Sequence, residues 1–96
     1  MYLHLGQDVI VHGDEIIGVF DLDTSTVAES TRDFLTISEK NRKVINVTTN
    51  LPKSFILCDK GKNYNNKKSY AVYISQISPQ TLLKRSKESL SIDDND

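Results

Sequence analysis

The chain has 96 residues and a net charge of −1, which predicts one small soluble domain with a single modest core. Its one cysteine, Cys58, excludes an intramolecular disulfide framework and favours a buried free thiol in a reducing compartment. The first residues have neither the basic region nor the apolar run of a secretory signal or a membrane anchor. We therefore expect a cytoplasmic protein with no membrane partner.

The charges are unevenly distributed along the chain. Residues 1–39 contain eight acids and one base, residues 40–87 contain eleven bases and one acid, and residues 88–96 contain four acids. This asymmetry favours either a basic surface that meets a polyanion or acidic and basic faces that meet between subunits. A third interpretation is that folding intermixes the two signs.

The N-terminal part predicts three strands. Short alternating runs at Tyr2–Leu5 and Val9–Val11 flank Gly6-Gln7, where glycine permits the positive φ of a tight hairpin turn. Residues Ile16–Phe20 form a nearly continuous apolar run. Because such a run suits burial on both faces, we expect this third strand inside the sheet.

A helix is predicted next. Side chains in Asp21–Ser25 suit the capping of a helix start, and Thr26 with Glu29 fits the capping box. The helix should end near Lys40-Asn41 and pack one side on the sheet. The residues of that side recur at helical spacing: Val27, Thr31, Phe34, Leu35 and Ser38.

The segment Lys43–Asp59 predicts two strands joined by a short turn. Strand-favouring side chains lie on both sides of Asn50-Leu51-Pro52, and proline in that tripeptide fixes φ and donates no hydrogen bond. We therefore expect a central hairpin here.

The C-terminal part predicts a loop, a strand, a helix and a tail. Residues Lys60–Lys68 are polar and basic, which is typical of a loop, and Tyr70–Ser75 alternates like a strand. Ser78-Pro79 suits the start of a short helix that continues to Arg85, and the acidic segment Glu88–Asp96 is expected to be disordered.

Together these elements predict a single α+β domain over residues 1–87, followed by a disordered acidic tail over 88–96. The domain should contain a small, mostly antiparallel β-sheet, one main packed helix and a short C-terminal helix.

No group of residues has the pattern of a catalytic, metal or cofactor site. His4 and His12 lack further ligands at useful spacing, and Cys58 lacks a sequence neighbour that would activate it. The four glycines are isolated, so there is no phosphate-cradling motif, and helix capping accounts for Asp21 and Asp23. We expect no enzyme activity, no cofactor and no small-molecule substrate.

The basic side chains of the second half are the more informative set. Lysine outnumbers arginine there, which favours contact with phosphates over bidentate reading of bases. The candidate DNA-binding residues are Arg42, Lys43, Lys53, Lys60, Lys62, Lys67 and Lys68.

Four segments resemble a known family. They are Met-Tyr-Leu-His-Leu-Gly at residue 1, Ile-Ile-Gly-Val-Phe-Asp-Leu-Asp-Thr at 16, Leu-Pro-Lys-Ser-Phe-Ile-Leu at 51 and Ile-Ser-Pro-Gln-Thr-Leu-Leu-Lys-Arg at 77. In order and spacing, from Met1 to about Arg85, they resemble the extracellular matrix regulatory (Rem) family of Gram-positive bacteria, in its RemB-like branch. The resemblance implies transcriptional control of biofilm matrix genes. The RemA branch implies a ring-shaped homo-oligomer that binds DNA, built from α+β protomers related to LytTR-type domains.

The sequence departs from the DNA-binding RemA branch at two places. That branch carries an arginine just before the third strand and adjacent arginines in the central turn, whereas Glu15 and Asn50-Leu51 stand here. Lys53 remains as the turn's basic residue. DNA binding is therefore not carried over from RemA by resemblance alone.

Two hypotheses follow. The first is a regulator that self-associates and contacts DNA through the candidate basic residues. The second is an oligomeric scaffold whose acidic and basic halves bind neighbouring subunits or a partner protein, without DNA.

Overall fold

The computed structural model describes residues 1–25, 28–48 and 50–94. In chain order the elements are β1 (Tyr2–Gly6), β2 (Val9–His12), the 3₁₀ turn η1 (Gly13–Glu15), β3 (Ile16–Asp21), α1 (Leu22–Ser25), α2 (Glu29–Lys40), β4 (Val44–Asn46), β5 (Ser54–Lys62), β6 (Lys68–Ser75) and α3 (Pro79–Asp94). The predicted α+β class is confirmed.

The strands form two sheets within the described residues. Strands β1 and β2 make an antiparallel hairpin, and the other four strands are ordered β3-β5-β6-β4. The pairs β3/β5 and β5/β6 are antiparallel, whereas β4 runs parallel to β6. The turn of the first hairpin has positive φ at Gly6 (119°) and Gln7 (50°), as its sequence predicts.

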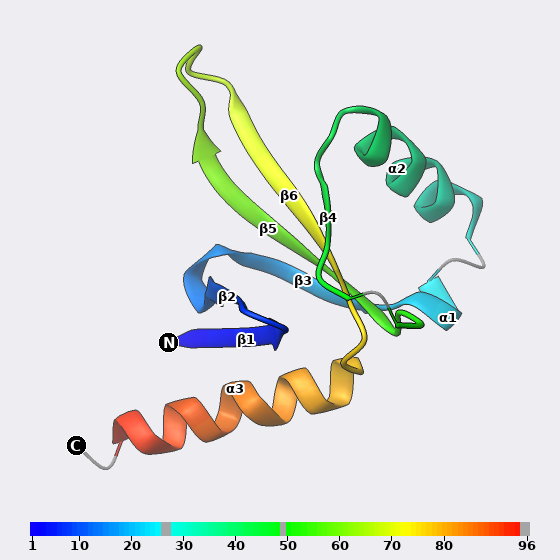
Figure 1. Cartoon of the computed structure of the whole chain (residues 1–96). Coiled ribbons are helices and arrows are strands. Elements are labelled where there is room, and N and C mark those ends of the chain that lie inside the picture. Colours follow the sequence, from blue (N-terminus) through cyan, green and yellow to red (C-terminus); the bar gives the residue numbers. More distant parts are fainter. Residues whose placement is uncertain (26–27, 49, 95–96) are drawn as a thin grey trace.

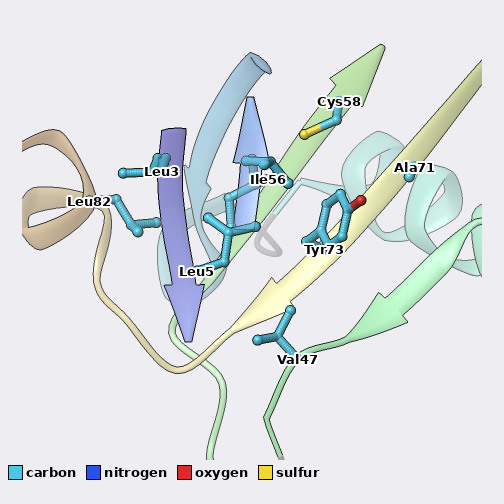
Figure 2. Packing of buried hydrophobic residues seen from close by; sticks show 9 residues of the cluster. Leu3, Leu5, Val47, Ile56, Cys58, Ala71, Tyr73 and Leu82 are labelled. Atoms are coloured by element: carbon cyan, nitrogen blue, oxygen red, sulfur yellow. The ribbon is translucent and has the colours of Figure 1, made fainter. Parts of the chain in front are cut away.

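The four-stranded sheet is covered on both faces (Figure 1). The β1–β2 hairpin and α3 lie on one face, where Ile56 and Tyr73 of the sheet pack with Leu5 and Leu82 (Figure 2). Helix α2 lies on the other face, where the Phe34 ring stacks on Tyr70 with 5.8 Å between ring centroids. The burial of Ser38 on that side agrees with the predicted packed stripe of the helix.

A buried serine joins the two sheets. Ser75 Oγ donates to the carbonyl oxygen of Leu5 at 2.6 Å and accepts from the backbone N–H of Ile77 at 3.0 Å. Nearby, Ser54 Oγ donates to the Ile77 carbonyl at 2.7 Å. These contacts satisfy backbone groups where the chain leaves β6 for α3, so the hairpin and the helix are held to the same end of the sheet.

The predicted central hairpin over Lys43–Asp59 is wrong. Strands β4 and β5 do not pair, because β6 lies between them and hydrogen-bonds to both. The local turn residues are present, but Asn50 is held by Gln76, whose Oε1 accepts from Asn50 Nδ2 at 2.7 Å. The connection therefore crosses the end of the sheet, and the hairpin partner of β5 is the strand that follows it.

Two further predictions are corrected. Strand β3 lies at an edge of the four-stranded sheet rather than inside it, and the side chain of Ile17 is 61% exposed. The segment Lys60–Lys68 is a loop only over residues 63–67, because β5 continues to Lys62 and β6 begins at Lys68. The polar composition of this segment, which suggested a loop, arises because the paired ends of β5 and β6 are surrounded by solvent.

The helix ends partly follow the sequence. Asp21 Oδ1 accepts from the backbone N–H of Asp23 at 2.8 Å and so caps α1. Ser78 Oγ accepts from the Thr81 N–H at 3.3 Å and caps α3. The capping box at Thr26 lies outside the described residues.

Helix α3 continues to Asp94, whereas the sequence predicts an end near Arg85. Residues 88–94 therefore have helical backbone where the sequence predicts a disordered tail, and residues 95 and 96 lie outside the described part. The domain boundary at residue 87 stays a prediction.

Candidate nucleic-acid interface

Strands β5 and β6 extend past the other elements as a two-stranded ribbon, which we call the β5–β6 ribbon and define as residues 59–70 (Figure 1). Residues 59–68 are all exposed, so neither face of the outer ribbon is covered in the described chain. Asp59 pairs with Tyr70 and Lys62 pairs with Lys68. The ribbon is therefore an ordered, hydrogen-bonded projection rather than a loop.

A bulge interrupts the ribbon at Gly61. The register shifts between Asp59 and Lys62, and Gly61 has φ of 74°, a conformation that side chains disfavour. Asp59 Oδ1 accepts from the Gly61 N–H at 2.7 Å and stabilises this conformation. Because a bulge bends a strand pair, this position sets the direction in which the tip projects.

The tip turn is held by Asn63. Its Oδ1 accepts from the backbone N–H groups of Asn65 at 2.9 Å and Lys67 at 3.1 Å. Its backbone N–H donates to the Lys67 carbonyl at 2.8 Å, and its carbonyl accepts from the Asn66 N–H at 2.9 Å. Asn66 adopts φ of 61°, which asparagine tolerates better than most residues. The turn thus has a defined shape without contact to the core.

Three of the predicted site residues meet at this tip. Lys62 and Lys68 are direct cross-strand partners, and Lys67 ends the turn. Among the described residues none of these three ammonium groups forms an ion pair with a carboxylate. Like charges directly opposite each other destabilise a strand pair, so an anion at the tip would relieve a repulsion that the folded chain carries.

Lys60 is paired instead. Its Nζ donates to Glu15 Oε2 at 2.7 Å and lies 5.2 Å from the centroid of the Tyr73 ring. The hydrogen bond to Glu15 is the largest cause of a raised Lys60 pKa, and Tyr73 adds to it. Lys60 is therefore fully charged at neutral pH, but a carboxylate neutralises its charge locally.

Arg42 and Lys43 adjoin the base of the ribbon. Arg42 is exposed and has φ of 59°, and its backbone N–H donates to the Glu39 carbonyl at 3.0 Å. The Lys43 Nζ donates to Ser69 Oγ at 3.3 Å and lies 5.8 Å from the centroid of the Tyr70 ring. The turn after α2 thus contributes two cations to the end of the sheet from which the ribbon projects.

Lys53 is not part of this group. It precedes β5, and its backbone N–H donates to the Ser75 carbonyl at 2.8 Å, at the end of the sheet opposite the ribbon tip. Nine strand residues span about 30 Å, so Lys53 and Lys62 cannot contact the same phosphate. The structure brings together six of the seven predicted residues and leaves Lys53 apart.

Sequence reasoning missed two features of this surface. The partnership of Glu15 with Lys60 joins residues 45 positions apart, and no local pattern indicates it. Tyr64 is 96% exposed at the tip, and its position depends on the ribbon being a strand pair. A Gly-Lys-Asn-Tyr-Asn-Asn-Lys-Lys run between two strands was the available signal for a hairpin turn.

The rest of the described chain bears on three other kinds of functional feature: a ligand pocket, a metal site and a membrane-spanning helix. A hollow of about 460 Å³ between α3 and β1 is lined mostly by apolar side chains, among them Leu3, Val19 and Leu82. Residues 1–25, 28–48 and 50–94 contain no group of three histidine, cysteine or acidic side chains placed to hold a metal ion. No helix in that part of the chain has the length and apolar character needed to cross a bilayer.

The ribbon and its surroundings define a small α+β domain that presents a cluster of cations at one end. The chain belongs to the RemA-like family, described as extracellular matrix regulatory protein A-like, whose model matches residues 2–85. It is also 29% identical over 93 residues to extracellular matrix regulatory protein B of Bacillus subtilis (strain 168), a match that covers 97% of this chain and 99% of that protein. The predicted membership of this family, in its RemB-like branch, is confirmed.

Proposed function

We propose that the chain is a non-enzymatic, cytoplasmic regulator of extracellular matrix gene expression that binds DNA phosphates through the basic end of its sheet. The family description and the name of the Bacillus subtilis relative support matrix regulation. The unpaired lysines at the ribbon tip support a polyanionic partner, and they are the observation that carries the proposal. Arg42 and Lys43 extend the same surface toward β4.

Phosphate binding is the chemistry that this cation cluster suits best. Each lysine that neutralises a phosphate releases a condensed counterion, so affinity should fall steeply with salt. Lys62, Lys67, Lys68 and Arg42 are exposed and free to move toward a duplex. We expect about four phosphate contacts from one protomer and a slope of log K against log salt of about −3 to −4.

Self-association completes the proposal, and a ring is the expected form. Strands β3 and β4 are both sheet edges, and each exposes an isoleucine: Ile17 is 61% and Ile45 is 41% exposed. Edges of this kind pair readily with another chain, and a head-to-tail contact between two different edges closes into a ring when the rotation permits.

The experiment is an anisotropy titration of labelled matrix-promoter duplex and random duplex at several salt concentrations. The variant Lys62→Gln/Lys68→Gln should weaken binding to both duplexes equally and reduce the slope by about 1.8. The matched control is Lys84→Gln/Lys87→Gln, which removes two exposed lysines from α3 and should leave the titration unchanged. Equal losses from both variants would point to non-specific charge attraction, which contradicts the proposal.

A scaffold without DNA is the second candidate, and the Glu15–Lys60 ion pair favours it. That pair shows acidic and basic halves of the chain already meeting within one protomer, as they could between protomers. Light scattering at low and high salt, combined with the DNA titration, separates the two functions. An assembly that loosens in high salt, together with no DNA binding by the wild type at low salt, would establish the scaffold.

A further inference from the structure

We propose that the β5–β6 ribbon reads DNA sequence by entering the major groove, with Tyr64 and Asn65 contacting base edges between the flanking lysines. This inference rests on the proposed DNA binding and names the part of the chain that gives it selectivity. The selectivity is assigned to the residues beside the tip lysines and not to the lysines themselves.

The shape of the ribbon fits one groove of a duplex. The major groove of B-DNA is about 12 Å wide and admits a two-stranded β-ribbon, whereas the minor groove is about half as wide. The outer ribbon is two strands wide, it is exposed from residue 59 to residue 68, and it projects clear of the helices (Figure 1). No other described element stands in the way of its approach.

The tip presents groups that recognise bases. Tyr64 is 96% exposed, and neither its hydroxyl nor its ring has a partner in the described chain. The carboxamides of Asn65 and Asn66 also make no hydrogen bond there, because only their backbone N–H groups are used. Asparagine pairs with N6 and N7 of adenine, and an aromatic ring can contact the thymine methyl group, so these side chains suit A·T pairs.

The turn is preorganised to hold those groups outward. The side-chain oxygen of Asn63 accepts hydrogen bonds from two backbone N–H groups of the turn. The carboxamides of Asn65 and Asn66 are therefore not needed to hold the turn. A turn with fixed shape loses little entropy on binding. The lysines on either side then neutralise phosphates across the groove, which places the tip without selecting a sequence.

The test begins with a pool of random duplexes from which the wild-type protein selects its preferred sequences. Selectivity is the ratio of affinity for a selected duplex to affinity for the unselected pool. Tyr64→Ala/Asn65→Ala should reduce this ratio at least about tenfold while leaving pool affinity and salt slope near the wild-type values. Lys62→Gln/Lys68→Gln should lower both affinities and preserve the ratio.

Two controls accompany the test. Leu51→Ala removes another exposed large side chain, 83% exposed and remote from the tip, and should change neither quantity. Thermal melting should be the same for the tip variant and the wild type, because both substituted side chains are exposed and form no hydrogen bond or ring contact in the described chain. Guanines that flank the selected A·T pairs present N7 in the major groove, so bound protein should protect those guanines from dimethyl sulfate.

The outcomes separate the two proposals. If the wild type binds no duplex, the proposed function fails and takes this inference with it. If the wild type binds DNA without selectivity, DNA binding stands and the proposed reading role of the tip is wrong. The same conclusion follows if Tyr64→Ala/Asn65→Ala retains the selectivity of the wild type. Protection of minor-groove positions alone would also overturn it. A double-stranded RNA of the selected sequence should bind at least about tenfold more weakly, because its major groove is too narrow and deep for side chains to read.

Discussion

Glu15 and Lys60 form an ion pair at 2.7 Å that ties the η1 turn to strand β5. Both side chains are about one-third exposed, so the pair contributes less than about 1 kcal/mol to the free energy of unfolding. Its larger effect is on the basic surface, because Glu15 stands beside Lys60, one of the cations near the ribbon base.

Replacement of Glu15 by glutamine should strengthen DNA binding. The substitution frees Lys60 to meet a phosphate, so the slope of log affinity against log salt should become steeper by about 0.9. Glu15→Arg should raise affinity further by adding a second cation. Anisotropy titrations measure both, and Lys60→Gln in the Glu15→Gln background should remove the gain. Unchanged affinity in Glu15→Gln would show that Lys60 lies outside the contact surface.

Ser75 should be more sensitive to mutation than its size suggests. Ser75→Ala leaves the Leu5 carbonyl and the Ile77 N–H without their buried partner, which should cost about 1–3 kcal/mol of unfolding free energy. Urea denaturation measures this loss. Ser30→Ala on the exposed side of α2 is the control and should fall within about 0.5 kcal/mol of the wild type. If Ser75→Ala lowers the free energy of unfolding by less than about 0.5 kcal/mol, a water molecule has replaced the hydroxyl as the partner of these backbone groups.

Cys58 should be unreactive in the folded protein. Burial raises its pKa from 9.0 to about 11, since desolvation disfavours the thiolate. At pH 8 a thiol reagent should label Cys58 rapidly in the urea-unfolded chain. It should label the native chain slowly, only when a transient opening of the fold exposes the thiol. A thiol that holds its proton more tightly when folded stabilises the fold below pH 9, and this contribution is lost as the pH rises to about 11. Cys58→Ala should therefore lose less stability than the wild type over that interval.

Removal of residues 88–96 should leave thermal stability nearly unchanged. The first half of α3 is held to the domain, since Leu82 is buried there and Arg85 donates to the His4 carbonyl at 3.2 Å. We expect a change in melting temperature of less than about 2 °C. A loss of several degrees by calorimetry would show that the end of α3 docks on the core. Because four acids are removed, DNA affinity should rise slightly.

The sequence predicted the local features of this fold better than the pairing of its strands. The first hairpin follows from Gly6-Gln7, and the start of α3 follows from Ser78-Pro79, because each is determined by neighbouring residues. The strand that pairs with each edge of β5 is determined by contacts between distant segments of the chain. Nothing near Asn50 indicates that β6 takes that place.

The candidate site was predicted in composition but not in arrangement. Six of the seven basic residues gather at one end of the sheet, as a shared surface requires, whereas Lys53 lies at the other end. The ribbon itself escaped prediction because an exposed strand pair has no apolar face, so its residues lack the alternation by which strands are recognised. The role of Glu15 as the partner of Lys60 requires a contact between distant segments.

Strand β6 is hydrogen-bonded to both β5 and β4, and this position governs when the domain can form. During synthesis the segments before Lys68 emerge first, yet β4 has no partner and β5 has only β3 until β6 follows. The nascent chain therefore exposes Phe55 and Ile56 with one side of their strand unpaired until β6 has emerged. We expect folding to be completed only after release of the last third of the chain from the ribosome, so truncated products should depend on chaperones for solubility.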